Sequence, residues 1–150
     1  GTVSNRPQLL VSRSRLVGAA STGVFADGCG VQLIDSELAE HKDGAVELRG
    51  STYRFAQLRV VRNQSPSNAA VRLSNDTIGV LAPQGTEDSL QDVCFEGNQV
   101  SQAVPAALDY GVGRTRVLRR PRFCGMGPPL LRGTCMVVDQ MPCISPPGCS

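Results

Sequence analysis

The chain has 150 residues, of which 41% are hydrophobic and 19% are charged, and its formal net charge is +2. This length fits one domain with a core of its own, and the composition excludes a disordered chain. No apolar run reaches the eighteen or so residues of a membrane span, and the small net charge does not by itself indicate a polyanionic partner.

The first part of the chain alternates as β-strands do. The stretch "PQLLVSRSRLVG" (7–18) predicts a strand with Arg13 and Arg15 on one face. A turn is expected at Asp27 and Gly28, and the following "GCGVQLID" predicts a second strand.

The segment 43–61 predicts two strands on either side of Gly50. Its apolar residues include three alternating pairs, which are Val46 with Leu48, Tyr53 with Phe55, and Leu58 with Val60. Because the apolar face changes between Phe55 and Leu58, a β-bulge is expected near Ala56 and Gln57.

The second half of the chain continues in short strands. The stretch 69–83 predicts two of them around a turn at 74–77, and "DVCFEGNQVS", "GRTRVLRR" and "TCMVVDQ" predict more. Helical turns are expected only at 35–41 and 104–110.

These elements predict an all-β fold stabilised by disulfides: an antiparallel β sandwich or barrel, or a short β-solenoid. An irregular tail rich in Cys, Pro and Gly is expected at the C-terminal end. The predicted organisation is an extended N-terminal arm (1–12), a β domain (13–123) and a disulfide-stapled tail of the same domain (124–150).

Two stretches resemble a known family. In "DGAVELRGSTYRFAQLRV", an Asp-Gly turn leads to an apolar-x-Leu strand, a Gly-Ser turn and another strand, carried by Asp43, Gly44, Val46, Leu48, Gly50, Ser51, Tyr53 and Phe55. This is similar to the repeat of FecR-type β-solenoid domains, and residues 71–86 resemble the family's second stretch, with its Gly-Thr pair at Gly85 and Thr86. The resemblance implies stacked β-rungs and a binding or signalling role without catalysis.

Charge alternates in sign along the sequence. Residues 35–48 carry five acids against one Lys, 49–72 five Arg and no acid, 73–112 six acids and no base, and 113–132 six Arg and no acid. Such blocks can neutralise one another between neighbouring strands of one molecule. Alternatively, they form complementary patches between subunits.

The six cysteines indicate disulfides made in an oxidising compartment. Cys124, Cys135, Cys143 and Cys149 are too widely spaced for a zinc site, and no Cys-x-x-Cys redox motif occurs, so neither a metal nor a cofactor is expected. The preferred pairing among the fifteen possible is Cys29 with Cys94, with the four tail cysteines paired among themselves. Covalent links would then replace the hydrogen bonds that the prolines of the tail cannot make.

Catalysis is not expected. The sole histidine, His41, lies in the charged stretch "EHKDG" and is predicted to be exposed, which leaves no base for a hydrolytic triad. Paired acids such as Asp88 and Asp92 could serve glycoside chemistry, but the chain has no Trp with which to line a sugar cleft.

An arginine cluster near the C-terminal end is a candidate polyanion-binding patch, formed by Arg114, Arg116, Arg119, Arg120 and Arg122. The same spacing also fits one face of an exposed strand. Nucleic acid is an unfavoured partner, because few aromatic residues are available to stack on bases.

Two sequons are candidate N-glycosylation sites. These are Asn75, which lies on a predicted hairpin turn, and Asn63, which is the poorer acceptor because Pro66 follows it.

The sequence therefore favours a secreted, non-catalytic structural protein of the extracellular space or cell surface. It would self-associate, as in a fibre, through its N-terminal arm and charge blocks. In the alternative arrangement the arm pairs within its own sheet. The second hypothesis is a monomeric module that binds a glycan, a peptide or a receptor, and the third is a disulfide-rich protease inhibitor using the loop "GMGPPLLRG". A secretion signal is expected to have been removed or to lie outside this sequence.

Overall fold

The structure is a computed structural model that describes residues 7–65, 69–74, 77–79, 87–100, 108–109, 116–125, 131–132, 135–143 and 149. These residues form strands and no helix, and they divide into three sheets. Sheet A contains β1 (Gln8–Ser12), β2 (Arg15–Val17), β4 (Gly30–Ala39), β6 (Thr52–Val61), β9 (Ile78–Gly79), β10 (Glu87–Gln91), β11 (Cys94–Glu96), β14 (Arg116–Arg119), β15 (Arg122–Cys124) and β17 (Cys135–Val138). Sheet B contains β3 (Val24–Asp27), β5 (Val46–Arg49), β8 (Val71–Leu73), β13 (Leu108–Asp109) and β16 (Leu131–Arg132), and a small third sheet pairs β7 (Gln64–Ser65) with β12 (Gln99–Val100).

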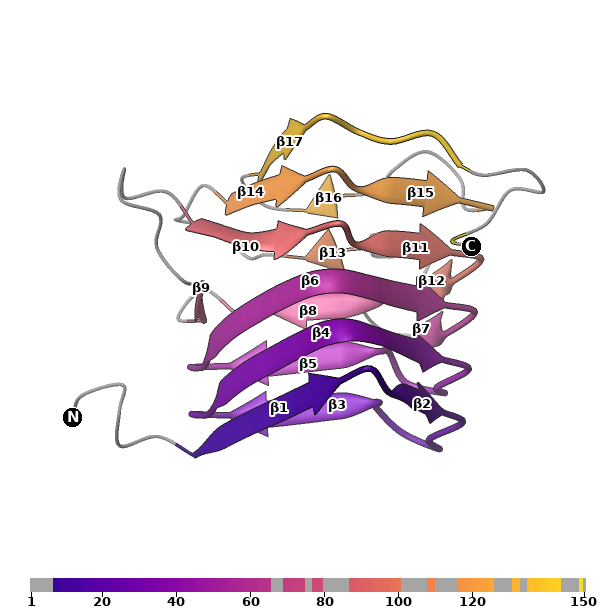
Figure 1. Cartoon of the computed structure of the whole chain (residues 1–150). Coiled ribbons are helices and arrows are strands. Elements are labelled where there is room, and N and C mark those ends of the chain that lie inside the picture. The colour runs from indigo at the N-terminus through magenta and orange to yellow at the C-terminus, as the bar shows by residue number, and fades with distance from the viewer. Residues whose placement is uncertain are drawn as a thin grey trace.

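The chain winds as a β-solenoid, with β1 at one end of the stack and β17 at the other (Figure 1). Gln8 pairs with Gly30 and Gly30 pairs with Thr52, so the chain returns to the same place in sheet A after 22 residues. Every strand pair in the described part is parallel, as between β4 and β6 or β3 and β5. The solenoid prediction is confirmed, and the antiparallel sandwich or barrel is wrong because no described strand turns back on its neighbour.

Each turn of the solenoid places equivalent residues in one column. One inward column contains Val11, Leu33, Phe55, Leu90, Leu118 and Val137. Leu33, Phe55 and Leu90 are at most 1% exposed, and each such burial contributes roughly 1.5–3 kcal/mol. The core is therefore a stack of apolar layers between sheets A and B.

A bulge recurs at one position of every level of sheet A. Its residues have left-handed backbone angles, with φ between 47° and 55°, and are Arg13, Asp35, Gln57, Asp92, Arg120 and Asp139. The bulge predicted near Ala56 and Gln57 is confirmed. The helical turn predicted for 35–41 is wrong, because residues 35–39 belong to β4 and the bulge at Asp35 changes the side-chain alternation there.

The charge blocks of the sequence coincide with the turns of the solenoid. The acidic block 35–48 falls in the turn of β4 and β5, and the basic block 49–72 falls mostly in the turn of β6 and β8. Ion pairs between neighbouring turns join Arg15 with Glu37, Arg59 with Glu37, Arg62 with Glu40, Arg72 with Glu47, and Arg120 with Asp92. Neutralisation within one molecule, the first of the two alternatives, is therefore present.

Candidate functional site

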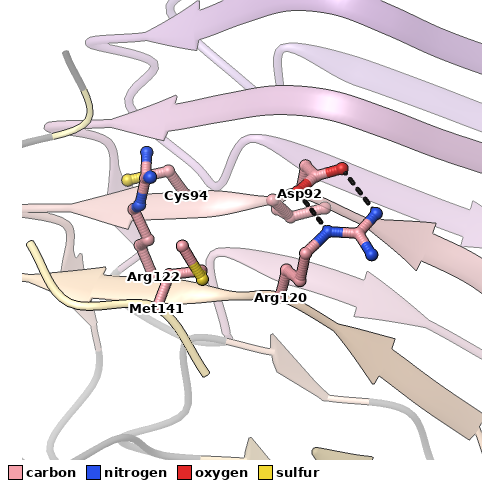
Figure 2. A pocket seen from close by; sticks show the side chains of 6 residues that line it. Asp92, Cys94, Arg120, Arg122 and Met141 are labelled. Atoms are coloured by element: carbon pink, nitrogen blue, oxygen red, sulfur yellow. Dashed lines mark hydrogen bonds and ion pairs between the residues drawn. The ribbon is translucent and has the colours of Figure 1, made fainter. Parts of the chain in front are cut away.

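A groove lies on the outer face of sheet A. It has a volume of about 270 Å³ and is lined by Asp35, Gln57, Arg59, Asp92, Cys94, Arg122 and Cys149. A smaller cavity of about 70 Å³ adjoins it, since Asp92, Cys94 and Arg122 line both, and Val93, Arg120 and Met141 complete its wall (Figure 2). We call the two together the disulfide groove.

Two columns of the solenoid build the disulfide groove. Asp35, Gln57 and Asp92 come from the bulge column. Arg59, Cys94 and Arg122 come from a second column, because Cys94 pairs with Arg59 on one side and with Arg122 on the other. Acidic and amide groups therefore line one side of the groove and guanidinium groups the other.

Asp92 is held by a bidentate ion pair. Nε and an Nη atom of Arg120 donate to its two carboxylate oxygens at 2.8 and 2.9 Å, as the dashed lines in Figure 2 show. These hydrogen bonds lower the pKa of Asp92 below its usual value; burial opposes the shift, and the charges of Arg120 and Arg122 add to it. Asp92 is therefore held in its ionised form, and each of its carboxylate oxygens accepts one hydrogen bond from Arg120.

Arg122 differs from Arg120. Its backbone N–H donates to the Val93 carbonyl at 3.1 Å, and its side chain passes beside Cys94 in Figure 2. The side-chain Nε is buried and has no hydrogen-bond partner. A buried donor without an acceptor is unfavourable by about 1–3 kcal/mol. Because Arg122 also lines both cavities, its guanidinium group is a place where a ligand could bind.

The cysteine pairing differs from the prediction in two respects: Cys29 and Cys94 are not joined, and the tail cysteines do not pair only among themselves, because Cys149 bonds to Cys94. Cys94 bonds to Cys149 and Cys124 bonds to Cys143, whereas Cys29 is a free, half-buried thiol. The predicted Cys29–Cys94 bridge is wrong: the parallel winding places Cys29 in the turn before β4, while Cys94 faces the tail from β11. The side chain of Cys135 lies outside the described residues.

Two members of the arginine cluster, Arg116 and Arg120, are occupied by contacts within the chain. Arg116 is 1% exposed and turns inward, where it donates to the carbonyls of Ser74 and Thr77 at 3.2 and 2.8 Å and lies over the Tyr53 ring. Arg120 is neutralised by Asp92. Arg119 lies on β14, half-buried, and Arg114 is outside the described residues, so the predicted polyanion patch is wrong for Arg116 and Arg120.

His41 is buried rather than exposed. It is 2% exposed, and the Ala19 N–H donates to its Nδ1 at 3.0 Å, while its Nε2 has no hydrogen-bond partner. Burial lowers the pKa of His41 below its usual value, with a smaller opposite effect from the Leu16 backbone. The prediction was wrong because one residue per turn points inward at this corner, whatever the charge of its sequence neighbours.

Asn63 lies one turn after His41 at the same corner of the solenoid, and it is an unsuitable glycan acceptor in the folded chain. It is 0% exposed; its Oδ1 accepts from the His41 N–H at 3.0 Å, and its backbone N–H donates to Asn98 Oδ1 at 2.9 Å. The prediction of a glycan at Asn63 is therefore wrong. Asn75 lies outside the described residues.

The N-terminal arm is partly built into the solenoid. Residues 8–12 form β1, which pairs in parallel with β4, so the alternative of pairing within the sheet is the one observed for them. Residues 1–6 lie outside the described part, as does most of the loop suggested for protease inhibition.

Exposed apolar side chains gather at the two ends of the solenoid. The large hydrophobic residues that are exposed in the described part are Leu9, Leu10, Val17 and Phe25 on β1 to β3, and Met136, Val137 and Met141 on and after β17. Leu10 at 63% and Phe25 at 54% are the most exposed of them.

The described residues show neither a metal centre nor a membrane-spanning helix. No three His, Cys, Asp or Glu side chains among them come together in a way that could hold a metal ion. They also include no helix of the length and hydropathy required to cross a membrane. In comparisons with known proteins, no family model, no curated protein and no solved structure matches the chain.

Proposed function

We propose that this chain is a secreted, non-catalytic structural subunit that associates end to end into filaments. The single observation that carries the proposal is that the exposed large apolar residues of the described part lie on the two end levels of the solenoid. Contiguous exposed apolar surface typically marks an interaction site, and an open strand edge is a template for another strand.

The two ends match in register. Following the strand pairs upward, Val137 lies in the same inward column as Val11, so β17 of one copy would lie over residues 9–12 of the next. This places Met136 beside Leu10, which are 50% and 63% exposed. The junction would continue sheet A from one copy into the next.

Charge at the junction is complementary as well. Asp139 and Arg13 occupy the bulge column at opposite ends, with φ of 55° and 47°, and neither has an ion pair with a described residue. In the stacked arrangement Asp139 would lie beside Arg13 of the next copy. Such a head-to-tail contact is heterologous and does not close, so it produces a filament rather than a dimer.

Disulfides support the secreted part of the proposal. Cys94–Cys149 and Cys124–Cys143 are structural bridges of the kind that persist in oxidising compartments.

A charge-reversal experiment tests the assembly. Sedimentation velocity of the wild type over a range of concentrations is expected to show growing oligomers, and negative-stain images should show filaments. Arg13→Asp alone and Asp139→Arg alone should each weaken association at least about tenfold, since like charges would meet at the junction. The double variant Arg13→Asp/Asp139→Arg should restore it.

Arg54→Asp is the matched control, because Arg54 is exposed on β6, which has neighbouring strands on both sides. This variant should assemble as the wild type does. A wild type that stays monomeric at high concentration would contradict the proposal. A species that stops at a dimer would contradict the head-to-tail arrangement.

A further inference from the structure

We propose that the disulfide groove binds a small organic acid that carries hydroxyl or amine donors beside its carboxylate. This inference concerns the outer face of sheet A and does not depend on association through the ends. It begins with the buried Nε of Arg122, which has no hydrogen-bond partner and belongs to a residue that lines both cavities.

The groove favours an anion beside the guanidinium group of Arg122. Asp92, which lines both cavities, accepts hydrogen bonds from Arg120 at both oxygens and makes none with Arg122, although the charge of Arg122 still acts on it. Arg59, on the other side of Cys94, has its nearest acid at 3.7 Å, and that acid, Glu37, also binds Arg15 more closely. Two guanidinium groups therefore flank Cys94 on adjacent strands, and guanidinium groups are well suited to bind carboxylates in a bidentate way.

The opposite side of the groove favours donors on the ligand. Asp35 makes no hydrogen bond or ion pair with another described residue, and it lines the groove together with the Gln57 amide. Its carboxylate would repel a bare anion but would accept a hydroxyl or ammonium hydrogen. Because Asp35 lies three strands from Arg122, a ligand must be several atoms long to reach both side chains, with the long arginine side chain covering part of the distance.

Size limits the ligand further. A volume of about 270 Å³ lies just below the range of pockets that hold drug-sized ligands, so a monosaccharide or an amino acid is of suitable size. A long polyanion is disfavoured, because Arg116 is buried and Arg120 is already paired. Two sources share the required chemistry, namely a uronic acid and an acidic amino acid.

Titration of the purified full chain tests this inference. Glucuronate and glutamate are added to the ¹⁵N-labelled protein, with glucose and inorganic sulfate as comparison compounds, and amide shifts are followed to saturation. Saturable binding of glucuronate, of glutamate or of both supports the proposal and identifies the source. Absence of saturable binding by both acids overturns it, as does sulfate or glucose binding as tightly as either acid.

Variants locate the site. Arg122→Gln should weaken binding of the acid at least about tenfold, and Asp35→Asn should weaken it several-fold. Arg54→Gln, an exposed arginine of β6 outside the groove, is the matched control and should bind as the wild type does. Unchanged affinity in Arg122→Gln overturns the proposal. If that variant loses its disulfides or its β-sheet circular dichroism, Arg59→Gln supplies the same readout.

Discussion

Buried polar side chains at one corner of the solenoid hold successive turns together. His41, Asn63 and Asn98 occupy equivalent positions, and each accepts a hydrogen bond from a backbone N–H or side-chain N–H of the ladder. The amides of Asn63 and Asn98 also donate to the carbonyls of Leu38 and Val60 at 3.0 and 2.8 Å. Each turn is thus fixed to the next through side chains as well as through the sheet.

His41 makes this ladder sensitive to acid. Its pKa is lowered by burial, so the folded state binds the proton more weakly than the unfolded state does. Stability is then fully present above the unfolded pKa of about 6.5 and is lost as the pH falls through the folded pKa. We expect the melting temperature to fall between pH 7.5 and pH 5, in part because a protonated Nδ1 cannot accept the Ala19 N–H.

The matched variant is His41→Asn, which would continue the asparagine ladder without a titrating group. Its melting temperature should depend less on pH over the same range, even if the smaller side chain lowers stability overall. An equal pH dependence in both proteins would show that another group is responsible.

The burial of this corner was not predictable from the local sequence. "EHKDG" is typical of an exposed turn, and Asn63-Gln64-Ser65 is typical of a surface sequon. The signal that could have placed them is the spacing of 22 between Ala19, His41 and Asn63, which is visible only once the period of the winding is known.

At the scale of the element, the recurring bulge determines which side chains face the groove and which face the core. Side chains three positions apart in a regular strand point to opposite faces. The bulge shifts the alternation of β6, so that Phe55 and Leu58 are both buried. This shift was predictable, because the apolar pattern changes face at that point. Its repetition at Arg13, Asp92, Arg120 and Asp139 was not, because the column mixes Arg, Asp and Gln, which are common at any exposed position of a strand.

Gln57 tests the energetic role of the bulge. Its φ of 53° is unfavourable for most side chains and worst for β-branched ones. Gln57→Val should therefore lower the free energy of unfolding by about 1–2 kcal/mol in urea denaturation. Arg54→Val, an exposed position of the same strand without a positive φ, should change it by about 0.5 kcal/mol or less. Equal effects of the two variants would contradict this account.

At the scale of the whole molecule, the strands were largely predictable and their arrangement was not. Alternation along β4 or β6 looks the same in a parallel and an antiparallel sheet. The return after 22 residues in the first turns decides between them, yet the column residues Leu9, Val31 and Tyr53 share only their apolar character. The Cys29–Cys94 pairing failed for the same reason, because local alternation does not show which strands lie side by side.

The two disulfides should contribute unequally to stability. Cys94–Cys149 spans 55 residues and Cys124–Cys143 spans 19. The loop-closure model gives about 4 kcal/mol for the longer span and about 3 kcal/mol for the shorter one. Replacing Cys94 and Cys149 by Ala should therefore lower the free energy of unfolding more than replacing Cys124 and Cys143.

Peptide mapping of the unreduced wild type is the control for these variants. It should yield peptides linked through Cys94–Cys149 and Cys124–Cys143, with Cys29 alkylated by iodoacetamide. A linked peptide that contains Cys29 and Cys94, or a larger loss from the Cys124/Cys143 variant, would contradict the expectation.

Both disulfides lie near the C-terminal end of the solenoid, so they stabilise its two ends unequally. In a solenoid, each level touches mainly the levels directly before and after it, so the molecule behaves as a nearly one-dimensional stack. Both covalent ties join β11 and β15 to the C-terminal tail, and none of them reaches β1 to β5. We therefore expect local unfolding to begin at β1, the indigo end of Figure 1, and to stop at the levels of β11 and β15, which the disulfides join to the tail.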